Sequence, residues 1–311
     1  MLAVDSAHDE LPMMNIGVIP LFRRGLVCDP DWVAELVTML DEEEVESLWG
    51  VEHVLVAENY KPNYPYSPDG RMPTDELTSM PDPLAWLTFA VAHSRRLKIA
   101  TGVLILPQYS PVQLAKRLAT LDQLTRGRVM LGAGLGWQEE EYAALNIPFA
   151  ERGRRMDENI RAMRALWTQQ PASFAGEFVR FDRVFCDVAT VQPGGVPIIV
   201  GGSTAAAARR AGRLGNGFYP YVISPEDLAE RMRDLESAAR DAGRDPAAVE
   251  LTVWPGSWQF RGSLDRELMR RYLDLPVRRV MIAQHEGETA DIPGLRTLIR
   301  QTRDALGELG R

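Results

Sequence analysis

The chain has 311 residues, of which 45% are hydrophobic and 25% are charged, as in an ordinary globular protein. Its net charge of −8 is spread over both signs without a basic stripe, which argues against nucleic acid as a partner. No apolar run approaches the ~18 residues that a membrane span needs, so we expect no membrane partner either.

The first segment, 1–12, lacks the basic and apolar parts of a secretion signal, and we expect a flexible lead-in. Beyond it, short apolar runs alternate with longer amphipathic ones. The apolar runs predict strands over Met13–Ile19, Ser47–His53, Leu97–Leu104, Arg128–Ala133, Pro197–Gly201, Gly217–Tyr221, Val249–Trp254 and Arg279–Ala283. The amphipathic runs predict helices over Asp31–Leu40, Pro83–Ser94, Pro111–Leu124, Arg152–Trp167, Thr204–Leu214, Pro225–Ala242, Leu264–Asp274 and Gly294–Leu309.

Several predicted strands are apolar on both faces, which is typical of parallel strands covered by helices. Eight strand–helix pairs predict an α/β fold, a (β/α)8 TIM barrel formed as a single domain by residues 1–311. A doubly wound open sheet is the alternative. The cysteines Cys28 and Cys186 lie far apart without metal-ligand spacing, so we expect no metal site and a reducing, cytoplasmic compartment.

Two insertions exceed ordinary α/β loops, one after strand two and one before strand five. Val54–Asp82 is rich in Pro, Tyr and Asp and leaves the C-terminal end of strand two, which predicts a lid over the barrel mouth. Gln169–Val196 could form a hairpin outside the barrel, and we interpret it as a surface elaboration.

Residues just past the C-terminal ends of barrel strands face the active site. Strand two ends at Glu52 and His53, and an imidazole there can exchange a proton near neutral pH. A structural histidine bonded to a backbone carbonyl is the alternative. His285 follows the last strand and is a weaker candidate, whereas His93 lies inside a helix and is expected to pack or face solvent. His8 in the lead-in receives no role.

Glycines end three of the predicted strands. Strand three ends near Gly102, and strand four ends in GAGLGW, 132–137, where a flat ring system could approach the backbone beside Trp137. Plain packing is the alternative for Gly102 and for Trp137. No acid follows the GAGLG run at the distance that a dinucleotide fingerprint requires. Gly201-Gly202-Ser203-Thr204 precedes a helix and predicts a phosphate site, with a capped helix start as the alternative.

Two charged runs lie near these loops. The acids Glu139, Glu140 and Glu141 are interpreted as the charged first turn of a helix. The basic run 151–155 could meet an acidic cofactor tail, but a solvated helix surface is the favoured interpretation.

Over about residues 47–220 the chain resembles the luciferase-like monooxygenase superfamily, and within it the coenzyme F420-dependent oxidoreductase branch. The segments that carry the resemblance include SLWGVEHV, YPYSPDGRMP, KIATGVLILPQYSPVQLAKRLATLDQLTRGRVMLGAGLGW, NIPFAERGRRMDENIRAMRALW and VPIIVGGSTAAAARRAGRLGNGFYP. The resemblance implies a TIM barrel with a flavin-type ring in its mouth and a homodimer.

Residue by residue, the resemblance implies an acid–histidine pair at Glu52 and His53, with His53 near the reactive carbon. It implies cofactor contacts at Gly102 and Val103, where relatives often hold a non-proline cis peptide, and at Leu135, Gly136, Gly201, Gly202, Ser203 and Thr204. Trp137 stands where the sugar-phosphate dehydrogenase branch has a glutamate, and the sugar-phosphate-binding lysines have no evident counterparts. A sugar phosphate is therefore not the expected substrate.

Together these features predict an F420-dependent oxidoreductase that transfers a hydride between the deazaflavin and a small organic substrate. The alternative enzyme is an FMN-dependent luciferase-like monooxygenase, because both ring systems share a ribityl phosphate. A non-catalytic barrel that binds or sequesters the cofactor is the alternative of another class.

Overall fold

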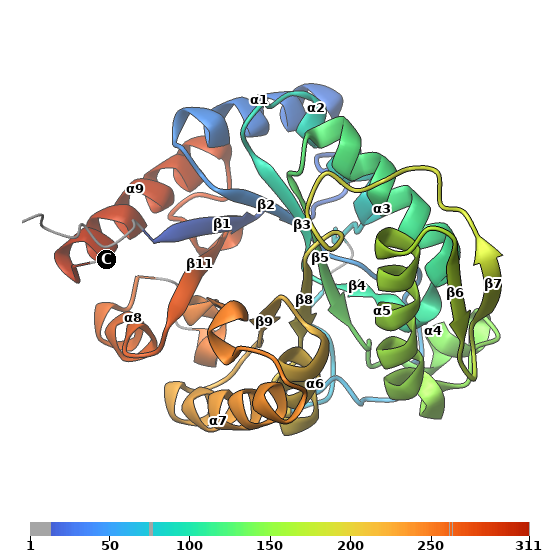
Figure 1. Ribbon diagram of the computed structural model, residues 1–311. Helices are drawn as coiled ribbons and strands as arrows, with labels where there is room; N and C mark the ends of the chain where they lie inside the picture. Colours follow the sequence, from blue (N-terminus) through green and yellow to red (C-terminus); the bar gives the residue numbers. More distant parts are fainter. Residues whose placement is uncertain (1–13, 75–76, 261, 263, 311) are drawn as a thin grey trace, which may run out of the picture.

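Figure 1 presents the computed structural model, which describes residues 14–74, 77–260, 262 and 264–310. The predicted lead-in 1–12 and Met13, the first residue of the first predicted strand, lie outside the described residues. The barrel strands are β1 (Asn15–Ile19), β2 (Ser47–Gly50), β3 (Lys98–Thr101), β4 (Leu104–Ile105), β5 (Val129–Gly134), β8 (Ile198–Gly201), β9 (Gly217–Tyr219), β10 (Glu250–Val253) and β11 (Val277–Ala283).

The helices surround these strands as an outer layer (Figure 1). They are α1 (Pro30–Glu42), α2 (Pro83–Ala92), α3 (Pro111–Thr125), α4 (Glu139–Ala144), α5 (Arg152–Thr168), α6 (Ala205–Leu214), α7 (Pro225–Asp241), α8 (Arg266–Leu273) and α9 (Ile292–Glu308). Each predicted helix is found with its ends within two residues of the prediction, and α4 is a short addition.

The strands close into a ring, which confirms the predicted TIM barrel and excludes the open sheet. Neighbouring strands follow the order β3-β2-β1-β11-β10-β9-β8-β5, and β3 also pairs with β5. All of these pairings are parallel, and Ile99 opposite Val129 closes the ring. The C-terminal ends of the strands therefore meet at one mouth, where active sites of this fold lie.

Local sequence explains where the helices begin. Asp29 precedes Pro30, and its side chain accepts hydrogen bonds from the first backbone N–H groups of α1. Asp82 caps α2 in the same way, with 2.7 Å between its Oδ1 and the nitrogen of Ala85. Such caps supply acceptors that the first helical turn lacks. The main core lies between helices and strands, and a second cluster fills the barrel around Trp49, Met281 and Tyr219.

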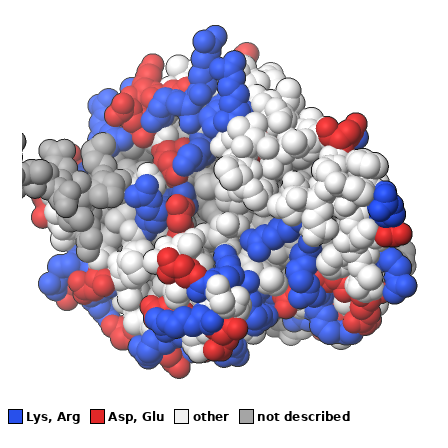
Figure 2. Space-filling model, viewed as in Figure 1, with Lys and Arg blue, Asp and Glu red and all other residues white. Residues whose placement is uncertain are grey.

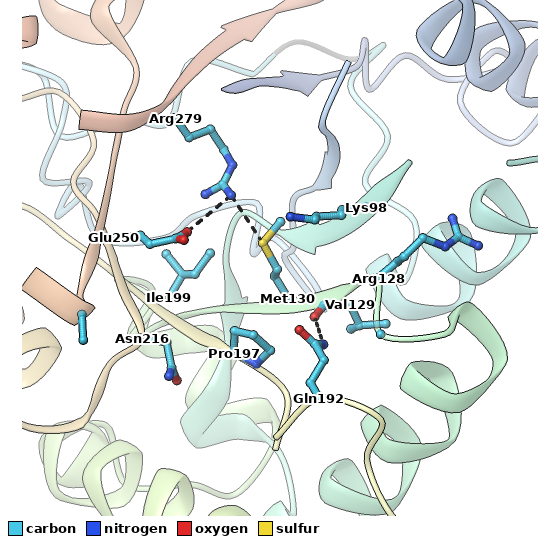
Figure 3. A pocket seen from close by; sticks show the side chains of 12 residues that line it. Lys98, Arg128, Val129, Met130, Gln192, Pro197, Ile199, Asn216, Glu250 and Arg279 are labelled. Carbon is cyan, nitrogen blue, oxygen red and sulfur yellow. Dashed lines mark hydrogen bonds and ion pairs between the residues drawn. The ribbon is translucent and has the colours of Figure 1, made fainter. Parts of the chain in front are cut away.

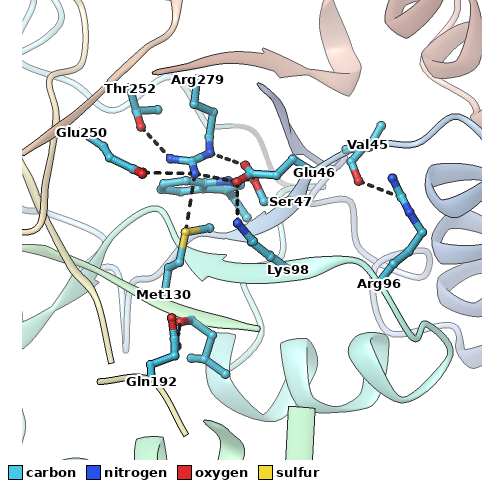
Figure 4. Close-up of polar contacts among 12 residues, drawn as sticks. Val45, Glu46, Ser47, Arg96, Lys98, Met130, Gln192, Glu250, Thr252 and Arg279 are labelled. Carbon is cyan, nitrogen blue, oxygen red and sulfur yellow. Dashed lines mark hydrogen bonds and ion pairs between the residues drawn. The ribbon is translucent and has the colours of Figure 1, made fainter. Parts of the chain in front are cut away.

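A buried ion pair closes the end of the barrel opposite the mouth (Figure 4). Arg279 is almost fully buried; its guanidinium forms a two-pronged contact with the Glu46 carboxylate and donates to Thr252 Oγ1 at 3.0 Å. Burial opposes ionisation of Glu46, but the hydrogen bonds and charge of Arg279, with help from Lys98, lower its pKa to about 2. Figure 3 shows the adjoining cavity of about 280 Å³, in which Arg279 faces Met130.

Most strand ends lie within two residues of the predictions, but two predicted strands differ more. Strand two ends at Gly50 instead of His53, because its pairing with β3 stops at Gly50 opposite Thr101. The predicted strand Leu97–Leu104 is divided into β3 and β4 by a cis peptide between Gly102 and Val103. Apolar periodicity in the sequence cannot reveal a backbone turn inside an apolar run.

Both insertions are present. The second contains the antiparallel hairpin of β6 (Ala172–Ala175) and β7 (Arg180–Val184), which lies outside the barrel against α5 (Figure 1). Within the described ranges, no helix is long and apolar enough to cross a membrane. Basic and acidic side chains are interspersed over the face in Figure 2, as the mixed charge of the sequence leads one to expect.

Candidate active site

The mouth of the barrel contains a cavity of about 740 Å³, within the usual range for ligand pockets. It brings together every residue for which the sequence predicted a site role. These residues are Glu52, His53, Gly102, Val103, Leu135, Gly136, Trp137, Gly201, Gly202, Ser203 and Thr204. They come from four different strand ends, which is the geometry that a closed parallel barrel imposes.

His53 lies in the loop after β2 with its side chain 9% exposed, between a carboxylate and an indole. Its Nδ1 is 3.1 Å from Glu141 Oε2, and its Nε2 accepts a hydrogen bond from Trp137 Nε1 at 3.2 Å. An indole N–H can only donate, so Nε2 must carry a lone pair and the ring proton must be on Nδ1. The two neighbours therefore select one tautomer of neutral His53.

Glu141 holds this histidine, and the sequence did not indicate it. Its side chain is fully buried, and Oε1 accepts a hydrogen bond from the backbone nitrogen of Val54 at 2.7 Å. All three acids do form the first turn of α4, as predicted. Glu139 and Glu140 contact Lys61, whereas Glu141 turns inward to His53, a role that the prediction did not include.

Glu52 does not orient His53. Its carboxylate accepts hydrogen bonds from the Tyr109 hydroxyl and from the backbone nitrogen of Ile105, the latter at 2.7 Å. Burial raises the pKa of Glu52 to about 7, although these two hydrogen bonds act in the opposite direction. Glu52 thus fixes the chain beyond the cis peptide and is a carboxyl that titrates near neutral pH beside the cavity.

The glycines at the mouth make room for Val103. A Cβ atom on Gly201 would lie 2.7 Å from Val103 Cγ1, and one on Gly134 would also strike Val103. Gly136 has φ +63°, a conformation that favours glycine. Close contact with the Val103 side chain therefore accounts for Gly134 and Gly201, and a left-handed backbone accounts for Gly136. The backbone that these glycines leave uncovered beside Val103 lines the cavity.

The predicted phosphate loop is an open turn that leads into α6. Gly202 has φ +112°, and Thr204 caps the helix by accepting a hydrogen bond from Ala207 N at 3.2 Å. Ser203 Oγ donates to the Tyr221 carbonyl and accepts from Tyr221 N. Both interpretations of the loop fit this geometry, because a capped helix start also presents backbone N–H groups to the cavity.

The basic run beside this loop contributes Arg152 to the cavity. Its guanidinium stacks on Phe149 at 3.7 Å, and its buried Nε has no hydrogen-bond partner among the described atoms. The interpretation of the run as a solvated surface is therefore wrong for Arg152, whereas Arg154 and Arg155 do pair with surface glutamates. Arg152 is half-buried and its Nη1 donates to the Phe149 carbonyl at 2.9 Å, so its Nε–H at the mouth remains suited to an anion.

The segment Val54–Asp82 extends over the mouth, as a lid would. Its described residues Tyr64, Tyr66, Met72 and Met80 line the cavity. The ring of Tyr66 lies 4.8 Å from that of Tyr221, so the segment reaches from β2 to the opposite side of the barrel at β9.

The other histidines are further from the cavity. His285 packs its ring against Trp254, and His93 ends α2 at the surface beside Phe89, as expected. His8 lies outside the described residues. Within the described ranges, no group of three or more His, Cys, Asp and Glu side chains is arranged to hold a metal ion.

Comparison with known proteins finds relatives of this chain that are oxidoreductases. An F420-dependent glucose-6-phosphate dehydrogenase of Nocardia farcinica is 38% identical over 180 residues, 56% of this chain and 53% of that protein. An FMNH2-dependent dimethylsulfone monooxygenase of Pseudomonas putida is 34% identical over 166 residues, 52% of this chain and 45% of that protein.

The crystal structure of a monooxygenase from Streptomyces bottropensis shares the fold, with a TM-score of 0.74 and 21% identity, covering 95% of this chain and 99% of that one. The model of the luciferase-like monooxygenase family matches residues 43–297, which span the barrel from the end of α1 to α9. This chain belongs to the luciferase-like monooxygenase family.

Proposed function

We propose that this protein is an oxidoreductase that uses coenzyme F420 to transfer a hydride to or from a small organic substrate. The observation that carries the proposal is the pairing, in one cavity, of an oriented neutral histidine with a phosphate site formed by a glycine loop and the half-buried Arg152, whose Nε has no hydrogen-bond partner among the described atoms. The histidine can donate or accept a proton, and the glycine loop with Arg152 can bind the phosphate of a ribityl-linked ring system.

The residues at the mouth fit such a cofactor. Arg152 Nε lacks a partner that a phosphate oxygen would supply, and the backbone of Gly202 and Ser203 lies across the same cavity. Val103 and Leu135 offer apolar surface for a flat ring. When bound there, the cofactor would supply the hydride chemistry, and the protein would orient the ring and exclude water.

His53 would be the proton partner of the reaction. In oxidation of an alcohol, His53 Nε2 would take the hydroxyl proton, while a bound cofactor would supply the acceptor for the hydride of the carbinol carbon. In reduction of a carbonyl, His53 would return the proton and the cofactor would supply the hydride. Glu141 keeps the proton of neutral His53 on Nδ1, so that Nε2 has the lone pair that the substrate proton needs. The indole N–H of Trp137 donates a hydrogen bond to that lone pair, so a substrate hydroxyl must displace the indole from Nε2.

The 34% sequence identity to an FMNH2-dependent monooxygenase supports a second candidate function, in which the same site binds a reduced flavin and oxygen. Titration of the pure protein with F420 and with FMN, followed by fluorescence quenching, separates the two. Tighter binding of F420 and no oxygen consumption with reduced FMN are expected. Tighter binding of FMN together with oxygen consumption would favour the monooxygenase.

The role of His53 is tested by His53→Ala, with His93→Ala on the surface as the matched control. We expect His53→Ala to lower turnover by about 10²–10⁴-fold, the usual contribution of general acid–base catalysis, with nearly unchanged cofactor affinity. Equal turnover by the variant and the wild type would remove His53 from the mechanism. It would favour the alternative that the barrel binds the cofactor without catalysing a reaction. A homodimer, which the resemblance implies, is proposed as well, and light scattering on the purified protein tests it.

A further inference from the structure

Aromatic rings form a continuous wall at the mouth of the barrel. Trp137 contacts His53, and its ring centroid lies 5.2 Å from that of Tyr64. Tyr64 contacts Tyr66, whose ring lies 4.8 Å from that of Tyr221. Tyr221 in turn contacts Trp254 at 5.3 Å. We call these five rings the aromatic wall: Trp137, Tyr64, Tyr66, Tyr221 and Trp254.

Several elements contribute to the aromatic wall, and all five rings line the cavity. Trp137 follows β5, Tyr221 follows β9 and Trp254 follows β10, whereas the two other tyrosines belong to the Val54–Asp82 segment. Four of the five contacts that link the rings to one another and to His53 are edge-to-face, which is a favourable aromatic geometry that fixes each ring. The wall is therefore a preformed surface for a flat or bulky apolar group.

The described side chains that line the cavity along this wall are uncharged. Phenols are neutral near pH 7, and burial raises the pKa of Tyr64, Tyr66 and Tyr221 further. The neighbouring lining residues are Ile19, Val51, Asn63, Pro65, Met72, Met80, Tyr219 and Val222. Glu52 is the one Asp or Glu among the described lining residues, and the Glu286 carboxylate, which accepts from Trp254 Nε1 at 2.9 Å, is not one of them.

Arg152 is the one Lys or Arg among the described lining residues, and it belongs to the phosphate end. The carbonyl of Gly153 next to it accepts a hydrogen bond from Arg210 of α6, the helix that begins at the phosphate loop. A phosphate or carboxylate at the aromatic wall would therefore have a cationic partner among the described lining residues only where it reached Arg152. Burying an anion without a partner costs several kcal/mol, so the wall disfavours anionic ligands. A cation could gain about 0.5–2 kcal/mol from the faces of the rings, which is less than the several kcal/mol that its unpaired burial costs.

We propose that the substrate is an uncharged molecule with an aromatic or aliphatic ring, which packs against the aromatic wall and directs one hydroxyl or carbonyl group to His53. This inference rests on the proposed function, because it assigns the remaining half of the same cavity. The substrate oxygen takes the place of the Trp137 indole as the partner of His53 Nε2, and the ring gains the apolar contacts of Tyr66, Tyr221 and Trp254.

Three probes with the same bicyclic body test this assignment: 2-naphthylmethanol, 2-naphthoate and 2-naphthylmethylammonium. Their affinities are measured by titration calorimetry on protein saturated with F420 or with FMN, so that the phosphate end is occupied. We expect the alcohol to bind at least tenfold more tightly than either ion. Equal or tighter binding of either ion, or no measurable binding of the alcohol, would overturn the inference.

Trp254→Leu locates the probe, and Phe89→Leu on the surface of α2 is its matched control. Loss of one aromatic contact should weaken binding of the alcohol about threefold to tenfold in the first variant and not in the second. Equal affinity in both variants would place the probe elsewhere and contradict the assignment. Failure of both cofactors to bind would contradict the proposed function instead, and the two failures are distinguishable because they are separate titrations.

Discussion

Glu141→Gln is the substitution that the site geometry makes most informative. The wild-type carboxylate accepts through both oxygens, from His53 Nδ1 at 3.1 Å and from the backbone nitrogens of Val54 and Leu55 at 2.7 and 3.4 Å. An amide has one accepting oxygen, and its NH2 group can only donate. Either His53 or the two backbone N–H groups therefore face a donor. His53 cannot escape by moving its proton to Nε2, where the proton would meet the N–H of Trp137.

The magnitude follows from burial. Glu141 is fully buried, so water cannot replace the lost acceptor. A buried donor left without a partner costs about 1–3 kcal/mol. We expect the free energy of unfolding of Glu141→Gln to fall by about that amount, and turnover to fall because His53 loses its tautomer and its orientation.

Urea unfolding followed by tryptophan fluorescence measures the loss of stability, and ¹⁵N NMR of the histidine side chains reports the tautomer of His53. Glu140→Gln, one residue away, is the matched control, because Glu140 is near the surface and contacts only Lys61 N; it should stay within about 0.5 kcal/mol of the wild type. Equal stabilities of the two variants would refute the reasoning, and so would an Nε2-protonated His53 in the wild type.

Three further predictions concern pH and backbone packing. The pKa of Glu52 is about 7 in the folded protein against an ordinary 4.5, so its contribution to stability is full below pH 4.5 and lost as pH rises through 7; Glu52→Gln should abolish this fall of ~3 kcal/mol in urea titrations at pH 4.5 and 8. The pKa of Glu46 is about 2, so the advantage of the wild type over Glu46→Gln should be full above pH 4.5 and vanish as pH falls to 2. Gly132→Ala should destabilise the protein by more than about 3 kcal/mol, because its Cβ would overlap the Thr101 carbonyl oxygen, whereas Gly307→Ala in α9, with open space around it, should stabilise by up to about 1 kcal/mol; thermal unfolding of both tests this contrast.

The alternation of short apolar and longer amphipathic segments predicted the strands and helices, because each expresses its own period locally. The count of eight strand–helix pairs and the family resemblance then favoured the barrel over an open sheet. The same pattern placed His53 and the loops at Gly102, Gly136 and Gly202 past strand ends. A closed ring of parallel strands then brings those ends to one cavity, so proximity followed from the fold class alone.

Tertiary structure alone decided which side chains meet inside that cavity. Glu141 and His53 are 88 residues apart, and α4 is too short for its periodicity to show which of three glutamates turns inward. The acid next to His53 in sequence, Glu52, points instead to Ile105 and Tyr109.

Arg152 and the aromatic wall depend on tertiary structure for the same reason. A basic residue in a charged run and tyrosines in an irregular segment have no periodic pattern that marks them as inward-facing. Their positions depend on how loops from separate strands pack over one another at the mouth. The sequence by itself thus determined the barrel and the loops at its mouth. The packing of those loops decided the partner of His53, the position of Arg152 and the make-up of the aromatic wall. The reason is that side-chain partners depend on distances between segments that no local period encodes.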